Sequence, residues 1–495
     1  MLENRYKQIT ISEHISLYDK IISKDHFLRK LKENIDFSFV NKLVKKEYSE
    51  TYGRPAKEPE MMYKLLFLQT KDLLSDREVI ERAKTDMAYK YFLDLNPEDE
   101  VPSYSLLSIF RNTKIKDENI LEKMLKETVR QAIEKGIIKS NSIIVDATHT
   151  NSRTEKKTQT QILRELSKNL RKEIYRREPE LKEVFPIKPD DAATLDEEIE
   201  YTKKLVENLK EKITETTNKK VQKRYEKVKE MLKDEKIRTI QSVQDIDAKQ
   251  GYKSEDNDFF GYKSHVAMTK ERIVTGLEIT SGEAPDGKFL PNLVEKSEQA
   301  GIEVKEVIGD KAYSGKENLT YGKSKGIKII SRMNPIITKG LKIKDDGFEY
   351  IKDADTLRCP MGQLAFNKIL VPGKKYKDGY RNPSMLYSFA KEKCKKCSRM
   401  NGCLGKTHDR GKRYKIKILM GVHKEQEEFE KTEYFNETLR KERYKIEAKN
   451  AETKIAHGLC KAKSVGLSCM RIQSYLAHIT ANIKRIIKKM DEVPA

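Results

Sequence analysis

Ile143-Ile144-Val145-Asp146 is the stretch of sequence that decides the fold, because three β-branched apolar residues run directly into an acid. Such a short apolar run predicts a buried β-strand. A second strand is expected over residues 304–308, which are followed by Gly309 and then by Asp310. Each acid is therefore expected at the end of a strand, where it is partly shielded from water yet still reachable. Taken alone, either aspartate is better explained as the cap of a turn.

The segments around these two acids predict a mixed α/β sheet. Residues 259–268 and 273–279 have the pattern of two strands joined by a turn. A helix is expected over about 288–300, the second acid-terminated strand follows it, and another helix leads to a strand over 327–331. This order of strands and helices is typical of a mixed sheet.

A third candidate acid lies in the C-terminal part of the chain. Arg443, Glu447 and Lys454 are spaced by four and by seven residues, which places them on one face of a helix. A carboxylate between two cations is suited to hold a divalent ion while the cations hold phosphate oxygens. A ladder of surface ion pairs has the same spacing, and Glu442 or Glu452 would replace Glu447 if the helix register differs.

Asp146, Asp310 and Glu447 together suit the cleavage of phosphodiester bonds. That reaction needs a positioned nucleophile and a stabilised leaving oxygen, and two metal ions about 3.5–4 Å apart supply both. Hard oxygen ligands favour Mg²⁺ or Mn²⁺. The three acids therefore predict a site for two Mg²⁺ (or Mn²⁺) ions.

The composition indicates a polyanionic partner. The chain of 495 residues has 100 Lys and Arg against 78 Asp and Glu, a formal net charge of +22. Such an excess attracts nucleic acid through its phosphates. The sequence contains no apolar run long enough to span a bilayer and no signal-peptide core, and its six cysteines do not make a disulfide framework. We therefore expect a cytoplasmic protein without a membrane partner.

Four parts are expected along the chain. They are a helical N-terminal domain for DNA binding or dimerisation (1–136), a catalytic core (137–154, 241–334 and 431–495), a helical hairpin insertion (155–240) and a Cys-containing β/loop insertion (335–430). The short N-terminal helices fit a helix-turn-helix DNA reader and an ordinary helical bundle about equally. One long helix is expected over 432–457, carrying the third acid.

The second insertion contains four of the six cysteines. Cys394 and Cys397 have the Cys-x2-Cys spacing of half a zinc site. Cys359 and Cys403 would complete it, although 44 positions separate them. A structural Zn²⁺ site and a set of free buried thiols both remain open.

Three further side chains lie close in sequence to the predicted site. His149 and Tyr313 each lie three residues after an acid, and His265 lies on a neighbouring strand. Each histidine could hydrogen-bond to a metal ligand and orient it. An ordinary position on the surface or a hydrogen-bonded position in the core explains each of them better. For Tyr313, core packing is an equal alternative.

Several stretches resemble the DDE transposases of bacterial insertion sequences. The N-terminal stretches are Gly53 to Ala56, Pro59 to Met62, Leu74 to Glu78 and Tyr91-Phe92, and the motifs around the two aspartates are Ile144 to Thr148 and Gly309 to Tyr313. Arg443, Glu447 and Lys454 are similar to the family's Arg-x3-Glu-x6-Lys signature. Where the family often has a tyrosine three residues before the arginine, this chain has Arg440.

The resemblance implies an RNase H-like catalytic core that cuts the transposon ends and joins them to target DNA. It implies that Asp146, Asp310 and Glu447 hold the metal ions and that Arg443 and Lys454 contact DNA phosphates. The expected partner is double-stranded DNA, at terminal inverted repeats and target, bound by a homodimer or higher assembly in the bacterial cytoplasm. An RNase H-like nuclease that cuts without joining and a catalytically decayed DNA-binding protein are the alternatives.

Overall fold

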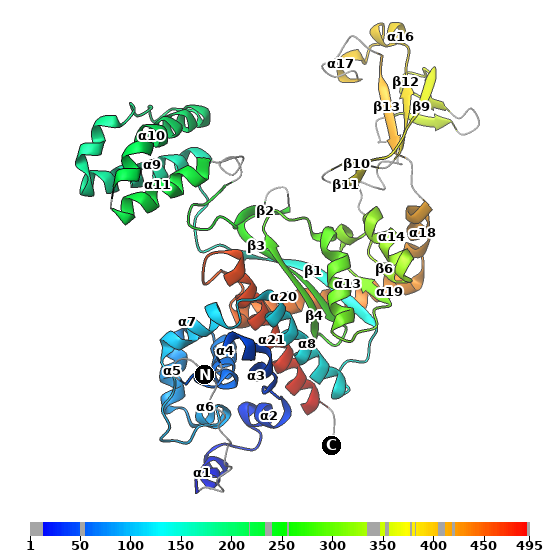
Figure 1. Ribbon diagram of the computed structural model, residues 1–495. Coiled ribbons are helices and arrows are strands. Elements are labelled where there is room, and N and C mark those ends of the chain that lie inside the picture. Colours follow the sequence, from blue (N-terminus) through cyan, green and yellow to red (C-terminus); the bar gives the residue numbers. More distant parts are fainter. Residues whose placement is uncertain are drawn as a thin grey trace.

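The computed structural model describes residues 13–49, 55–216, 218–232, 240–254, 257–333, 347–351, 356–376, 379–381, 383–403, 411–417 and 421–492 (Figure 1). It is a mixed α+β protein, as expected from the sequence. Gly53 and Arg54 of the N-terminal resemblance lie outside the described residues. Within these ranges no helix is long and apolar enough to cross a membrane.

A six-stranded sheet lies at the centre of the protein. Its strands are β1 (Ser142–Asn151), β2 (Lys249–Ser254), β3 (Asn257–Thr269), β4 (Val274–Ser281), β5 (Glu306–Ile308) and β6 (Lys328–Ile330). The strand order is β2-β3-β1-β5-β6, and β4 pairs with β3 on the same side as β2. β1 is antiparallel to β3, whereas β1, β5 and β6 are parallel to one another. The mixed sheet expected from the sequence is therefore present.

β1 is the central strand, and its first half is the apolar run quoted above. Ile143, Ile144 and Val145 are buried, as are the two apolar residues opposite on β5, Val307 and Ile308. β1 continues beyond the predicted strand because its pairing with β3 persists as far as Asn151. A strand buried on both faces accounts for an apolar run without alternation.

Helices cover both faces of the sheet. The Ser264 hydroxyl on β3 lies 3.0 Å from that of Ser474 in α21 (Leu467–Asp491). The next residue, His265, stacks on Phe289, just before α13 (Leu290–Gln299). Because adjacent side chains of a strand point to opposite faces, α21 and α13 lie on opposite sides of β3.

The N-terminal helices share one hydrophobic core with the sheet. They are α1 (Glu13–Ile21), α2 (Phe27–Asn34), α3 (Phe39–Val44), α4 (Pro59–Lys71), α5 (Asp76–Thr85), α6 (Met87–Phe92), α7 (Tyr104–Thr113) and α8 (Glu118–Glu134). One cluster of buried apolar side chains joins α2 to α8 with the sheet and extends from Leu28 to Ile487. α5 begins with a capping box formed by Ser75 and Glu78. These helices therefore pack directly onto the body that carries the sheet.

The insertion between β1 and β2 contains three long helices, not the two of the expected hairpin. They are α9 (Gln159–Arg177), α10 (Leu195–Glu215) and α11 (Lys219–Leu232). The missed helix, α10, buries a stripe of Tyr201, Leu205, Leu209 and Ile213 at helical spacing. The three helices form a hydrophobic core of their own and project from the body (Figure 1).

A second projection lies between β6 and α18 (Gly421–Glu430) (Figure 1). It contains the short strands β7 (Glu349–Ile351), β8 (Thr356–Arg358), β9 (Asn367–Val371), β10 (Lys374–Tyr376), β11 (Gly379–Arg381), β12 (Ser384–Ser388) and β13 (Arg413–Lys417), with α16 (Lys391–Lys395) and α17 (Met400–Cys403). Its small core centres on Phe348, Leu357, Tyr387 and Phe389. The expectation of short strands and loops agrees with these elements.

The single long helix expected over 432–457 is wrong, because two helices occupy this segment. α19 (Glu433–Glu442) and α20 (Tyr444–His457) meet at Arg443. Phe435 of α19 packs edge-on against Phe429 of α18, whereas α20 packs on β1 and α21. The two helices are anchored to different neighbours, so the chain turns between them.

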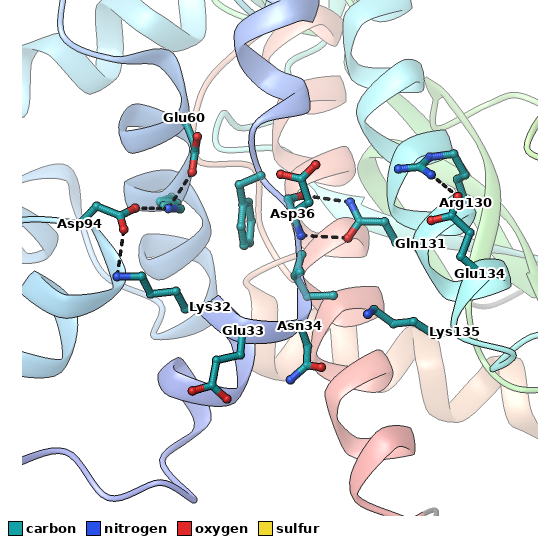
Figure 2. A pocket seen from close by; sticks show the side chains of 13 residues that line it. Lys32, Glu33, Asn34, Asp36, Glu60, Asp94, Arg130, Gln131, Glu134 and Lys135 are labelled. Atoms are coloured by element: carbon teal, nitrogen blue, oxygen red, sulfur yellow. Dashed lines mark hydrogen bonds and ion pairs between the residues drawn. The ribbon is translucent and has the colours of Figure 1, made fainter. Parts of the chain in front are cut away.

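A charged cluster ties the N-terminal helices together beside a cavity of about 730 Å³ (Figure 2). The Lys64 ammonium in α4 lies 2.7 Å from Glu60 and 2.6 Å from Asp94. Lys32 of α2 also pairs with Asp94, at 2.9 Å. Only 5% of the Lys64 side chain is exposed. The two carboxylates therefore depend on Lys64 for neutralisation.

We expect Lys64→Met to lower the free energy of unfolding by about 3 kcal/mol, because it leaves two poorly solvated carboxylates without their main cation. Urea denaturation followed by circular dichroism measures the change. Lys84→Met is the matched control: Lys84 pairs with Glu81 on the exposed surface, where such a pair contributes less than about 1 kcal/mol. Equal unfolding midpoints for the two variants would contradict the role given to Lys64.

Candidate active site

Asp146 and Asp310 lie close together where β1 pairs with the parallel strand β5. Asp310 follows the end of β5 as expected, but Asp146 lies within β1 and not at its end, because pairing with β3 extends β1 to Asn151. Ile144 on β1 pairs with Ile308 on β5. Asp146 follows Ile144 by two residues, and Asp310 follows Ile308 by two residues. Burial raises the pKa of Asp146 to about 7, and the charge of Asp310 adds to the increase. Burial also raises the pKa of Asp310. Two adjacent carboxylates repel each other when both are ionised, and a cation bound between them would stabilise their ionised forms.

A third acid at this place, Asp286, was not predicted from the sequence. It begins the short helix η3 (Asp286–Phe289), and its charge raises the pKa of both Asp146 and Asp310. The Lys263 ammonium on β3 donates to Asp286 at 2.8 Å and to the carbonyl of Ala284 at 2.9 Å. Asp286 follows a proline and precedes a glycine, so the sequence alone suggested no more than a turn.

Asn450 of α20 is the second residue that the sequence did not single out. Its Nδ2 donates a hydrogen bond to Oδ2 of Asp146 at 2.9 Å. The signal in the sequence was its position, three residues after Glu447 and four before Lys454. These spacings put Asn450 on the helical face that carries the Arg443, Glu447 and Lys454 signature.

Glu447 lies one turn before Asn450 on that face. Its side chain is 57% exposed and pairs with Arg443 at 3.5 Å. Glu452, one alternative third acid, pairs instead with the buried Lys449 at 2.8 Å. Across the described ranges, no three His, Cys, Asp or Glu side chains form a group ready to hold a metal ion. The structure thus brings the two aspartates together, and within the described residues Glu447 does not form such a group with them.

The two predicted phosphate-contacting cations lie along the same helix face. The charge of Arg443 lowers the pKa of both Asp146 and Asp310. Lys454 has its ammonium 3.2 Å from Nδ1 of His149 on β1. His149 therefore contacts the lysine of the signature.

The other two flanking side chains differ in their surroundings. His265 is fully buried, with Nε2 3.0 Å from the Thr280 hydroxyl, and burial lowers its pKa to about 4, so it is neutral near pH 7. Tyr313 is also buried; burial raises its pKa, and the charges of Asp146, Asp286 and Asp310 add to the rise. The Tyr313 hydroxyl has no hydrogen-bond partner among the described residues.

The four cysteines of the second insertion line one cavity. Cys359 follows β8, Cys394 lies in α16, Cys397 follows α16, and Cys403 ends α17. All four are free thiols of intermediate exposure. Within the described residues, the four thiols are not close enough together to form a metal-binding group.

The charges and burial of this site suit a divalent cation. Two adjacent carboxylates with raised pKa values lose their repulsion when a cation binds between them. Carboxylate oxygens are the ligands preferred by Mg²⁺ and Mn²⁺. Asp146 and Asp310 therefore fit such an ion, and Glu447 is the nearest acid of the signature on α20.

Comparison with known families agrees with the resemblance found in the sequence. Residues 16–113 match the family described as Transposase domain (DUF772), and residues 358–487 match the family described as Transposase DDE domain. The second match includes Glu447, whereas Asp146 and Asp310 lie outside both matches. No curated protein matches the chain. Both matches are to transposase domains, which supports an insertion-sequence DDE transposase and implies DNA as its partner.

Proposed function

We propose that this protein cuts DNA at the ends of an insertion sequence and transfers the freed ends to target DNA. It acts on terminal inverted repeats as a homodimer or higher assembly. The observation that most supports this proposal is the adjacent, partly buried pair of Asp146, within β1, and Asp310, just after the parallel strand β5. A protein that only binds DNA has little need for two adjacent acids whose pKa values are both raised.

In this proposal Asp146, Asp310 and Glu447 hold two Mg²⁺ (or Mn²⁺) ions. When bound, such ions activate the attacking water or hydroxyl and stabilise the leaving oxygen. The protein's own share is to keep two carboxylates partly dehydrated and adjacent, and to bring a third acid on a separate helix. Arg443, beside both aspartates, and Lys454, further along α20, would hold the DNA phosphates.

We also propose that the sheet and its helices are an RNase H-like core. The support is the arrangement of an antiparallel meander, β1-β3-β4, that continues into the parallel strands β5 and β6. The two aspartates lie where β1 and β5 pair, Asp146 within β1 and Asp310 just after β5.

The catalytic assignment predicts that Asp146→Asn, Asp310→Asn and Glu447→Gln each abolish end cleavage and joining while DNA binding persists. Each substitution removes a charge that a metal ion needs and keeps the size of the side chain. The measurement uses linear DNA carrying the element's terminal repeats, a target plasmid and Mg²⁺. Glu442→Gln is the matched control, because Glu442 pairs with Lys445 and should remain active.

Different products separate the alternatives. Cleavage without joining by the unchanged protein would favour an RNase H-like nuclease. Absence of both reactions, with DNA binding retained, would favour a decayed copy. If Glu447→Gln is active and Glu442→Gln or Glu452→Gln is inactive, the third acid has been assigned to the wrong position on the helix.

The raised pKa of Asp146 predicts a pH-dependent effect of Asp146→Asn on stability. Since the pKa rises from 3.8 to about 7 on folding, the folded state keeps a proton that the unfolded chain releases between these values. Ionisation of Asp146 therefore destabilises the folded protein, and asparagine avoids this. In metal-free buffer the gain in melting temperature should increase from about pH 4 to about pH 7 and stay constant above it. Asp25→Asn, on the exposed surface, is the control. If the gain in melting temperature of Asp146→Asn did not depend on pH, the raised pKa of Asp146 would be contradicted.

A structural Zn²⁺ ion at Cys359, Cys394, Cys397 and Cys403 is part of the proposal for the second projection. The support is that the four free thiols line one cavity, although binding would require them to draw closer. Metal analysis of purified protein should find about one zinc per chain. Cys394→Ser/Cys397→Ser should lose it, whereas Cys460→Ser/Cys469→Ser, outside the cavity, should keep it. Absence of zinc from the unchanged protein would favour plain thiols.

A further inference from the structure

Asn450 makes a direct hydrogen bond from α20 to a proposed metal ligand. Its Nδ2 lies 2.9 Å from Oδ2 of Asp146, and only 8% of the residue is exposed. An ionised carboxylate can only accept, so the amide must present its NH₂ group to Asp146. The bond occupies one carboxylate oxygen and leaves the other to its remaining partners. Asn450 therefore fixes how Asp146 is oriented.

The same bond sets the position of α20 along β1. Lys454, one turn beyond Asn450, contacts His149, three residues beyond Asp146. The two contacts follow one another along the helix and the strand in the same direction. Since Glu447 lies three residues before Asn450 on the same face, any rotation or sliding of α20 at Asn450 moves Glu447 relative to the aspartates.

The other amide atom gives a second, independent observation. Oδ1 of Asn450 is buried and has no hydrogen-bond partner among the described residues. A buried carbonyl oxygen without a donor is unfavourable. A water molecule held at the aspartates would supply the missing donor. The NH₂ group of the Asn450 amide thus binds the Asp146 carboxylate. Its carbonyl oxygen is available to accept a hydrogen bond from a group that binds beside the aspartates.

We propose that Asn450 is a positioning residue of the active site, which orients Asp146 for metal binding and holds Glu447 in register with it. The inference rests on the proposed metal-dependent function. Residues that hydrogen-bond to metal ligands typically affect metal affinity or activity by about 10–100-fold when they are removed. Asn450 should have an effect of this size without being a metal ligand.

The test compares Asn450→Ala and Asn450→Leu in the full-length protein. The alanine variant removes the whole amide, whereas the leucine variant keeps approximately its size and loses the NH₂ donor without adding a charge. Isothermal titration of the metal-free protein with Mn²⁺ measures affinity without DNA, and end cleavage is measured over a range of Mg²⁺ concentrations. Both variants should need about 10–100-fold more metal.

Asn436→Ala is the matched control. Asn436 of α19 donates to the carbonyls of Glu430 and Thr432, both at 2.9 Å, so it supports the local backbone away from the aspartates. Its loss should leave the metal requirement unchanged. Melting temperatures of all variants show whether each is folded, and the similarly sized Asn450→Leu keeps the test informative if Asn450→Ala unfolds.

The outcomes separate this inference from the function on which it rests. An unchanged or lower metal requirement in Asn450→Leu would overturn the positioning role, since packing alone would then explain Asn450. If Asp146→Asn itself cleaves DNA normally and binds Mn²⁺ normally, the proposed function fails whatever Asn450 does. Loss of Mn²⁺ binding in Asp146→Asn together with the expected shift in both Asn450 variants supports both.

Discussion

The repulsion between two partly buried carboxylates is the constraint on which the rest of the site depends. Parallel pairing of β1 with β5 brings Asp146 and Asp310 to the same level. Burial raises both pKa values, so the metal-free site has an unfavourable charge that folding must tolerate. Arg443 offsets this charge and Asp286 increases it, with Lys263 as a local counter-ion for Asp286. Such electrostatic repulsion lowers the stability of the protein. Perturbed pKa values of this kind are typical of functional sites.

Helix α20 completes the arrangement because it runs along β1 and not across it. Asn450 meets Asp146, Lys454 meets His149, and beyond the helix Ala462 donates its backbone amide to the carbonyl of Asn151. Three contacts in the same order define both the rotation and the position of the helix. An acid on this face of α20 is consequently placed by the backbone and not only by its own side chain.

The sequence was sufficient for features that depend on local composition. The apolar run before Asp146 predicted a buried strand, because burial is encoded by neighbouring residues. Asp286 could not be predicted, since it follows no strand and reaches the site only through the folding of the β4–α13 connection. The break at Arg443 was missed for a related reason: helical spacing continues across it, and only packing against different neighbours turns the chain there.

The continuous core explains how the N-terminal helices can influence a site to which they contribute no acid. α4 packs against both α20 and α21, and the His457 ring at the end of α20 lies 3.4 Å from the backbone carbonyl of Thr70 in α4. The two projecting insertions, by contrast, have hydrophobic cores of their own. A rearrangement within either insertion can be absorbed at its connections to the body. A shift of α4 cannot be absorbed in this way, because close-packed interiors transmit displacement, and α20 carries both Asn450 and Glu447.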